Sequence, residues 1–186
     1  MADPPRSERT DLTALRRLVE RELDTLDWPV PFDIDALLGQ IGARRGKPLS
    51  LFPAALPADG PSGLVIERVD DVVIVFDDAL PLLQQEHVIM HEAAHVLFGH
   101  RGTALDDLAG EGLSELDPEL VDQAQRIVHR DGYSSADETV AEIAAALMWL
   151  RVGAARSMIP PRAAPAEVAE ANARFAAALT RRGRVT

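Results

Sequence analysis

The sequence HEAAHVLFGH (residues 91–100) determines how the rest of the chain can be interpreted. It ends a longer stretch, residues 82–98, that contains neither glycine nor proline and therefore favours one uninterrupted helix. Pro81 suits the first turn of this helix, because that position needs no backbone N–H donor. Gly99 suits its end, since glycine readily adopts the left-handed conformation that closes a helix. The segment therefore predicts a helix over residues 82–98.

Within this helix, His91 and His95 are four residues apart and lie on the same face. Two imidazoles in this arrangement can bind one metal ion, as in the H-E-x-x-H motif of zinc-dependent proteases. Glu92 lies about 100° round the helix from His91, so it should not bind the metal directly. We expect it instead to reach a water on the metal and accept its proton. A chance match to the H-E-x-x-H pattern occurs in roughly one of a hundred shuffled chains of this composition. The alternative is a pair of surface histidines beside a salt-bridging glutamate.

A catalytic zinc site needs a third protein ligand and an open position for water. His100 follows His95 by five residues, but the extended zinc signature requires Gly at position 98 and His at position 101. Phe98 and Arg101 stand there instead, so that class fits poorly. His129 is a further candidate that no surrounding pattern supports.

The segment ETVAE, residues 138–142, offers a better third ligand. Glu138 and Glu142 lie four residues apart on one helical face. One carboxylate can bind the metal while the other accepts the free ring N–H of a histidine ligand. By analogy with the glutamate helix of thermolysin-like proteases, Glu138 is the ligand and Glu142 the orienting acid. The reverse assignment, or an ordinary acidic helix start favoured by the helix dipole, stays open.

Composition excludes several other kinds of site. The chain has 186 residues, with 30 Asp and Glu against 19 Lys and Arg, and a formal net charge of −11. So acidic a chain is a poor candidate for direct nucleic-acid binding. It has no cysteine, so a metal must be held by His, Asp or Glu. No apolar run is long enough for a membrane span or a signal peptide, so we expect a cytoplasmic protein.

Hydrophobic periodicity predicts both helices and strands, so we expect an α+β fold with a small twisted sheet packed on a helical core. If His91, His95 and Glu138 share one ion, the metal helix must face the glutamate helix. Two β-branched runs joined across Asp70 and Asp71 suggest a hairpin. We expect helices at residues 11–27, 33–45, 82–98, 118–129, 135–152 and 165–180, and strands at 49–52, 63–69 and 72–76. The expected organisation is a disordered terminus (1–9), one metallopeptidase domain (10–155) with an acidic loop (101–117), and a C-terminal linker and helix (156–186).

Several of these segments together resemble the ImmA/IrrE family of metallo-endopeptidases. The resemblance covers roughly residues 28–150. It rests on PFDIDALL (31–38), PSGLVIE (61–67), VVIVFDD (72–78), HEAAHVLFGH (91–100), and the later E-x-x-A helix with its AALM stretch (145–148). It implies a zincin-like endopeptidase of narrow specificity whose partner is a helix-turn-helix repressor, in stress, mobile-element or toxin–antitoxin-like regulation.

Two further residues are candidates for the site. His87 precedes His91 by one turn and is either an orienting or substrate-facing group or a solvent-exposed residue. Tyr133 is the only tyrosine, and its phenol can donate a hydrogen bond to an oxyanion, although a simple packing role is the alternative. The strand at 72–76 is a candidate edge for pairing with an extended substrate.

Two functional hypotheses follow from these residues. In the first, His91, His95 and Glu138 hold Zn²⁺, or Mn²⁺, which the same ligands accept, and Glu92 is the general base of an endopeptidase. In the second, the metal is structural, and the chain is a non-catalytic module that binds a DNA-binding regulator. An acidic adaptor without metal is a weaker third possibility.

Overall fold

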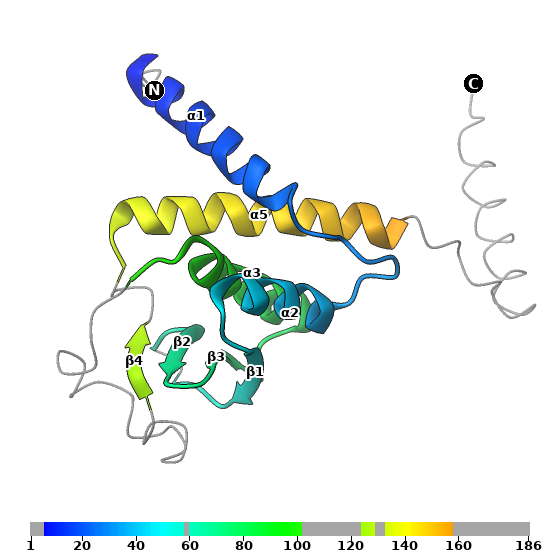
Figure 1. Cartoon of the computed structure of the whole chain (residues 1–186), viewed down its shortest axis with the longest axis vertical. Helices are drawn as coiled ribbons and strands as arrows, with labels where there is room; N and C mark the ends of the chain where they lie inside the picture. The colour runs from blue at the N-terminus through cyan, green and yellow to red at the C-terminus, as the bar shows by residue number, and fades with distance from the viewer. Residues whose placement is uncertain (1–5, 58–59, 102–123, 129–132, 158–186) are drawn as a thin grey trace, which may run out of the picture.

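The computed structural model describes residues 6–57, 60–101, 124–128 and 133–157, and these form an α+β fold. The elements follow one another in the order helix, helix, three strands, helix, strand, helix (Figure 1). Their bounds are α1 (Arg6–Leu23), α2 (Ile34–Arg45), β1 (Leu49–Ala54), β2 (Gly63–Arg68), β3 (Val72–Asp77), α3 (Leu82–Phe98), β4 (Ala124–Val128) and α5 (Ser135–Ser157).

The strands form one mixed sheet in the order β1-β3-β2-β4. The predicted hairpin is confirmed, because β2 and β3 pair antiparallel and the Arg68 N–H donates to the Asp71 carbonyl at 2.9 Å. β1 pairs parallel with β3 on the other side. The strand predicted at 72–76 therefore lies inside the sheet, and the hypothesis that it is a free edge for substrate pairing is wrong.

β4 corrects a second prediction. Residues 118–129 were expected to form a helix, but residues 124–128 form a strand that pairs antiparallel with β2. The physical reason is non-local: the edge of β2 offers backbone partners that a single-sequence pattern does not reveal. The β-branched pair Ile127-Val128 also suits an extended conformation. Residues 118–123 and 129 lie outside the described residues.

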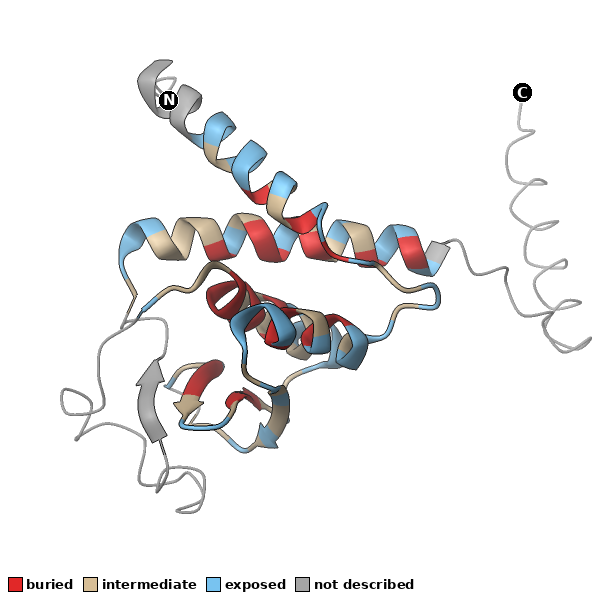
Figure 2. Cartoon of the chain, in the orientation of Figure 1, coloured by how far each residue is buried: buried red, intermediate tan, exposed pale blue. Residues whose placement is uncertain are grey.

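Helix α3 lies between the sheet and α5, so it is the central element of the fold (Figure 1). The buried faces of α3 and α5 are turned toward each other (Figure 2), and small residues such as Ala141 allow the two helices to approach closely. The hydrophobic core contains residues from the sheet, α3 and α5, including Val65, Ile74, Met90, Ala94, Ala144 and Met148. This packing fixes the position of α5 relative to the HEAAH segment.

The ends of the helices follow the predicted capping residues. Asp33 accepts hydrogen bonds from the backbone N–H groups of Asp35 and Ala36, at 3.0 and 3.2 Å, and so caps α2. Gly99 caps the end of α3, directly after Phe98, and its φ of 68° is left-handed. The His100 N–H then donates to the His95 carbonyl at 3.0 Å, so the chain folds back on the last turn of α3.

Other boundaries differ from the prediction. α1 begins at Arg6, so residues 6–9 are helical rather than disordered, and it ends before residue 27. α5 continues to Ser157, beyond the expected helix end at residue 152. Residues 1–5, the expected loop from 102 onward, the Asp131-Gly132 turn and the expected helix at 165–180 lie outside the described residues. Of the helices the structure describes, none could cross a membrane.

Candidate metal site

Helices α3 and α5 bring together the three residues predicted as metal ligands. The Nε2 atoms of His91 and His95 are 3.1 Å apart. The Glu138 carboxylate lies opposite them, with Oε2 at 3.6 Å from His91 Nε2 and Oε1 at 3.4 Å from His95 Nε2. The three side chains are 12%, 1% and 18% exposed, in that order. This group could hold a metal ion.

The spacing of the donor atoms suits a tetrahedral site. Bonds of about 2.0–2.1 Å in tetrahedral geometry place neighbouring donor atoms about 3.3 Å apart. The two imidazole nitrogens lie 3.1 Å apart, and each lies 3.4–3.6 Å from a different oxygen of the Glu138 carboxylate. Two neutral imidazoles and one carboxylate are also a ligand set of catalytic zinc enzymes, which leaves a fourth position for water. The residues present therefore fit a bound metal ion.

Glu92 lies beside this group rather than in it. Its side chain is 4% exposed, and a Cβ added to Gly63 of β2 would lie 3.3 Å from its Oε1. Its Oε2 is buried and accepts no hydrogen bond from the residues that the structure describes. Burial, and then the charge of Glu138, raises the pKa of Glu92 from 4.5 to about 8 in the metal-free protein. A carboxyl group in this range can take up and release a proton near neutral pH, as a general base must.

His95 is held as a neutral imidazole, which is the form that binds metal. Burial, followed by the neighbouring His91 and His100, lowers its pKa from 6.5 to about 3. Its Nδ1, the ring nitrogen that does not face Glu138, lies 3.0 Å from Nδ1 of His100. His100 Nε2 in turn lies 3.6 Å from Asp137 Oδ1, and burial lowers the pKa of His100 while Asp137 opposes that effect.

His100 and Asp137 are the site residues that sequence reasoning missed. The spacing of His100 suggests only a third metal ligand, and in the candidate group that place is taken by Glu138. The available signal was Gly99, since a left-handed residue after the helix turns the next side chain back toward it. Asp137 carried a second signal, as it is the fourth residue of a Ser-x-x-Asp capping sequence starting at Ser134.

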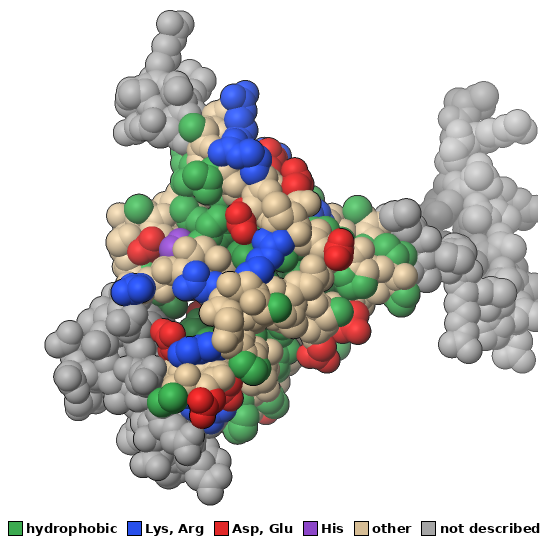
Figure 3. All heavy atoms as spheres, in the orientation of Figure 1, with side chains coloured by type: hydrophobic (Ala, Val, Ile, Leu, Met, Phe, Trp, Pro, Cys, Tyr) green, Lys and Arg blue, Asp and Glu red, His purple; other side chains and the backbone are tan. Residues whose placement is uncertain are grey.

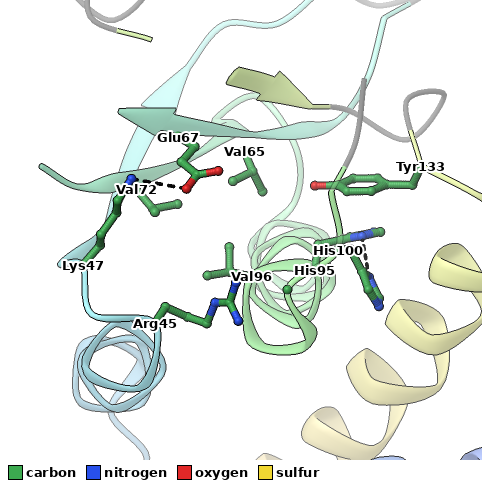
Figure 4. A pocket seen from close by; sticks show the side chains of 10 residues that line it. Arg45, Lys47, Val65, Glu67, Val72, His95, Val96, His100 and Tyr133 are labelled. Atoms are coloured by element: carbon green, nitrogen blue, oxygen red, sulfur yellow. Dashed lines mark hydrogen bonds and ion pairs between the residues drawn. The ribbon is translucent and has the colours of Figure 1, made fainter. Parts of the chain in front are cut away.

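Tyr133 lies flat against His95, with ring centroids 3.6 Å apart and an angle of 17° between the planes. Figure 4 shows its hydroxyl pointing into a pocket beside Val65. Burial, then the charges of Glu92, Glu138, Asp137 and Glu67, raise the pKa of the phenol well above its ordinary value. The hydroxyl therefore stays protonated and can donate a hydrogen bond. Its role as an oxyanion donor stays a prediction.

The pocket in Figure 4 has a volume of about 80 Å³ and lies on the His100 side of His95. Arg45 and Lys47 contribute positive charge to its lining, and Lys47 Nζ is 3.2 Å from Glu67 Oε1. Its lining does not include His91, Glu92 or Glu138. Of the three candidate ligands, the pocket therefore contacts only His95, and its volume is too small for a peptide.

Glu142 and His87 are exposed side chains on α5 and α3. Both lie on the predicted helices, and their roles as orienting groups stay predictions. The expected acidic loop falls almost wholly outside the described residues. On the face shown in Figure 3, basic and acidic side chains of the described residues are interspersed, so neither sign forms a continuous patch there.

Comparison of the chain with protein-family models, with curated proteins and with solved structures found no match. The likeness to the ImmA/IrrE family therefore rests on the sequence segments quoted above, and the chemistry rests on the geometry of the His91, His95 and Glu138 group.

Proposed function

We propose that this protein is a zinc-dependent endopeptidase. The observation that carries the proposal is the group of three residues that could hold a metal ion, with the buried carboxyl group of Glu92 beside it. Zinc is favoured over manganese because two imidazoles and one carboxylate at tetrahedral spacing suit zinc, whereas manganese prefers more oxygen ligands.

Each residue has a defined task in this proposal. His91, His95 and Glu138 would hold the ion, which supplies Lewis acidity by acidifying water and polarising a peptide carbonyl. Glu92 accepts the proton of the attacking water on its carboxylate and then donates that proton to the leaving amine. Tyr133 packs against the ring of His95, and its protonated hydroxyl is the proposed hydrogen-bond donor to an oxyanion.

The proposed substrate is a helix-turn-helix transcriptional repressor, which the protein would cleave or antagonise. This part of the proposal is supported by the resemblance to the ImmA/IrrE family. In the non-catalytic alternative, the same metal group only shapes a surface that binds such a regulator. This alternative makes a different prediction for Glu92.

The test begins with zinc content, measured by elemental analysis on wild type, Glu92→Gln, Glu138→Ala and, as a control, Gln84→Ala. Gln84 lies on the same helix as the two histidines but is exposed, so its removal leaves the zinc content at one per chain. Glu92→Gln keeps one zinc, whereas Glu138→Ala loses it. A wild-type protein that neither carries nor takes up zinc contradicts the proposal.

Activity is then measured as cleavage of a candidate repressor, followed by mass spectrometry, and as relief of repression in a reporter strain. Loss of the general base lowers turnover by about 10²–10⁴-fold, so Glu92→Gln neither cleaves the repressor nor relieves repression. If Glu92→Gln relieves repression without cleavage, the non-catalytic module is correct. If it still cleaves the repressor, Glu92 is not the base.

A further inference from the structure

A line of polar side chains runs from the first turn of α5 to the metal group. Ser134 Oγ donates to Asp137 Oδ2 at 2.8 Å, which leaves Asp137 Oδ1 facing His100 Nε2 at 3.6 Å. His100 Nδ1 faces His95 Nδ1 at 3.0 Å. His95 then presents its Nε2 to Glu138. Every member of this line belongs to the described residues, and the two histidine side chains are 1% and 8% exposed.

Local backbone structure holds both ends of this line in place. Gly99 is left-handed, and the His100 N–H donates to the His95 carbonyl, so the two rings are brought edge to face with centroids 5.0 Å apart. At the other end, the Asp137 N–H donates to Ser134 Oγ at 3.1 Å, which is the capping interaction that starts α5. The positions of His100 and Asp137 thus follow from two helix ends.

The protons in this line can be assigned by elimination. His95 must keep the lone pair of Nε2 for a metal, so its proton resides on Nδ1. That proton needs an acceptor at hydrogen-bond distance, and His100 Nδ1 is in that position. The proton of neutral His100 then resides on Nε2, toward the carboxylate of Asp137. Any other arrangement either sets two N–H groups against each other or blocks the metal-binding nitrogen of His95.

We propose that His100, held by Asp137, is a positioning residue that fixes the ring plane and the metal-binding tautomer of His95. The inference rests on the proposed function, because it needs the metal group to exist. Histidine ligands commonly donate their second N–H to a carboxylate or carbonyl, and loss of that partner costs roughly 10–100-fold in metal affinity or activity. In this protein the partner of His95 is a second histidine, His100, and the carboxylate of Asp137 faces His100 rather than His95.

The experiment measures the affinity of the full-length protein for zinc, by competition with a chromophoric chelator, and needs no substrate. His100→Phe keeps a ring but removes the acceptor, whereas His100→Asn places an amide oxygen near the position of Nδ1. Gln84→Phe is the control, since it places the same ring at an exposed position of α3. His100→Phe binds zinc roughly 10–100-fold more weakly with one zinc per chain at saturation, while His100→Asn stays within roughly threefold of wild type.

A second measurement separates positioning from a general effect on folding. With Co²⁺ in place of zinc, His100→Phe changes the visible absorption of the bound ion, whereas His100→Asn and the Gln84 control do not. The thermal midpoint of the metal-free variants is recorded in parallel. If His100→Phe does not fold, Asp137→Ala is compared with Asp137→Asn, which keeps an acceptor for His100 Nε2–H, and only the alanine variant weakens zinc binding.

Three results would overturn the inference. The first is wild-type zinc affinity in His100→Phe, or in Asp137→Ala where His100→Phe does not fold. The second is complete loss of zinc from His100→Phe as in His95→Ala, which would make His100 a ligand. The third is equal weakening by the phenylalanine and asparagine variants. In each case wild type still binds one zinc, so the proposed function survives. A wild type that binds no zinc contradicts both.

Discussion

Gly63 is the residue where one added methyl group gives the clearest test of the packing around Glu92. It begins β2 and faces α3, and a Cβ at this position would lie 2.4 Å from Cγ1 of Val88. The same Cβ would lie 3.2 Å from Cγ and 3.3 Å from Oε1 of Glu92. A β-branched side chain in a helix has essentially one favourable χ1 rotamer, so Val88 cannot rotate away without cost. Either Val88, α3 or β2 must therefore move.

Gly63→Ala is expected to lower the free energy of unfolding by about 1–3 kcal/mol, the usual cost of forcing a methyl group into filled space. Gly153→Ala is the matched control, because its Cβ would meet no atom within 4 Å in the interior of α5. That substitution should stabilise the protein by about 0.5–1 kcal/mol through helix propensity. Urea unfolding of the metal-free proteins, followed by circular dichroism, measures both changes.

The same variant also tests the role of Glu92. None of the three atoms nearest to the added methyl group belongs to His91, His95 or Glu138, so we expect Gly63→Ala to keep one zinc per chain while displacement of Glu92 lowers turnover. An unfolding free energy for Gly63→Ala within about 0.5 kcal/mol of wild type, the ordinary range of surface substitutions, would refute the close approach of β2 to α3.

Two further predictions concern stability. In the metal-free protein, the pKa of Glu92 is raised from 4.5 to about 8 and that of His95 is lowered from 6.5 to about 3. The folded state therefore keeps a proton on Glu92 that the unfolded state releases. As the pH rises from 6.5 to 8, the free energy of unfolding therefore decreases by up to about 1.4 kcal/mol per pH unit. As the pH drops below 4.5, the free energy of unfolding also decreases, because His95 is protonated in the unfolded state and not in the folded state; between pH 4.5 and 6.5 the two effects oppose each other. Urea titrations across this pH range should show the alkaline fall in wild type and not in Glu92→Gln. Met148→Ala removes a fully buried side chain between α5 and the core, so it should cost about 2–5 kcal/mol; a loss below 1 kcal/mol would contradict that packing.

Much of the fold follows from signals that are local in the sequence. α2 has a capping Asp33 and a closing Gly46, and α3 is a long stretch without helix breakers, so both are found within one or two residues of their predicted ends. The hairpin of β2 and β3 is equally local. β4 is not, because its five residues become a strand only through pairing with β2, which lies far away in the sequence.

The residues of the candidate site also differ in whether local sequence signals could predict them. The spacing of His91 and His95 is a property of one helix and could be predicted. The choice of Glu138 came from analogy with the glutamate helix of thermolysin-like proteases, because helical spacing alone left Glu142 open. The contact between His95 and His100 could not, because helical periodicity no longer applies beyond Gly99. The stacking of Tyr133 on His95 depends on where the chain enters α5, which is set by the packing of α5 on α3.

The location of Glu138 in the first turn of α5 links ligand binding to the fraying of a helix end. The Glu138 N–H makes one of the first hydrogen bonds of α5, to the Ser134 carbonyl at 3.0 Å, and terminal turns open more readily than helix interiors. An ion that bridges Glu138 to α3 can bind only while this turn is closed. Zinc should therefore slow amide hydrogen exchange at the start of α5 far more than at its centre, and fluctuations of this one turn would set how fast the protein releases its metal.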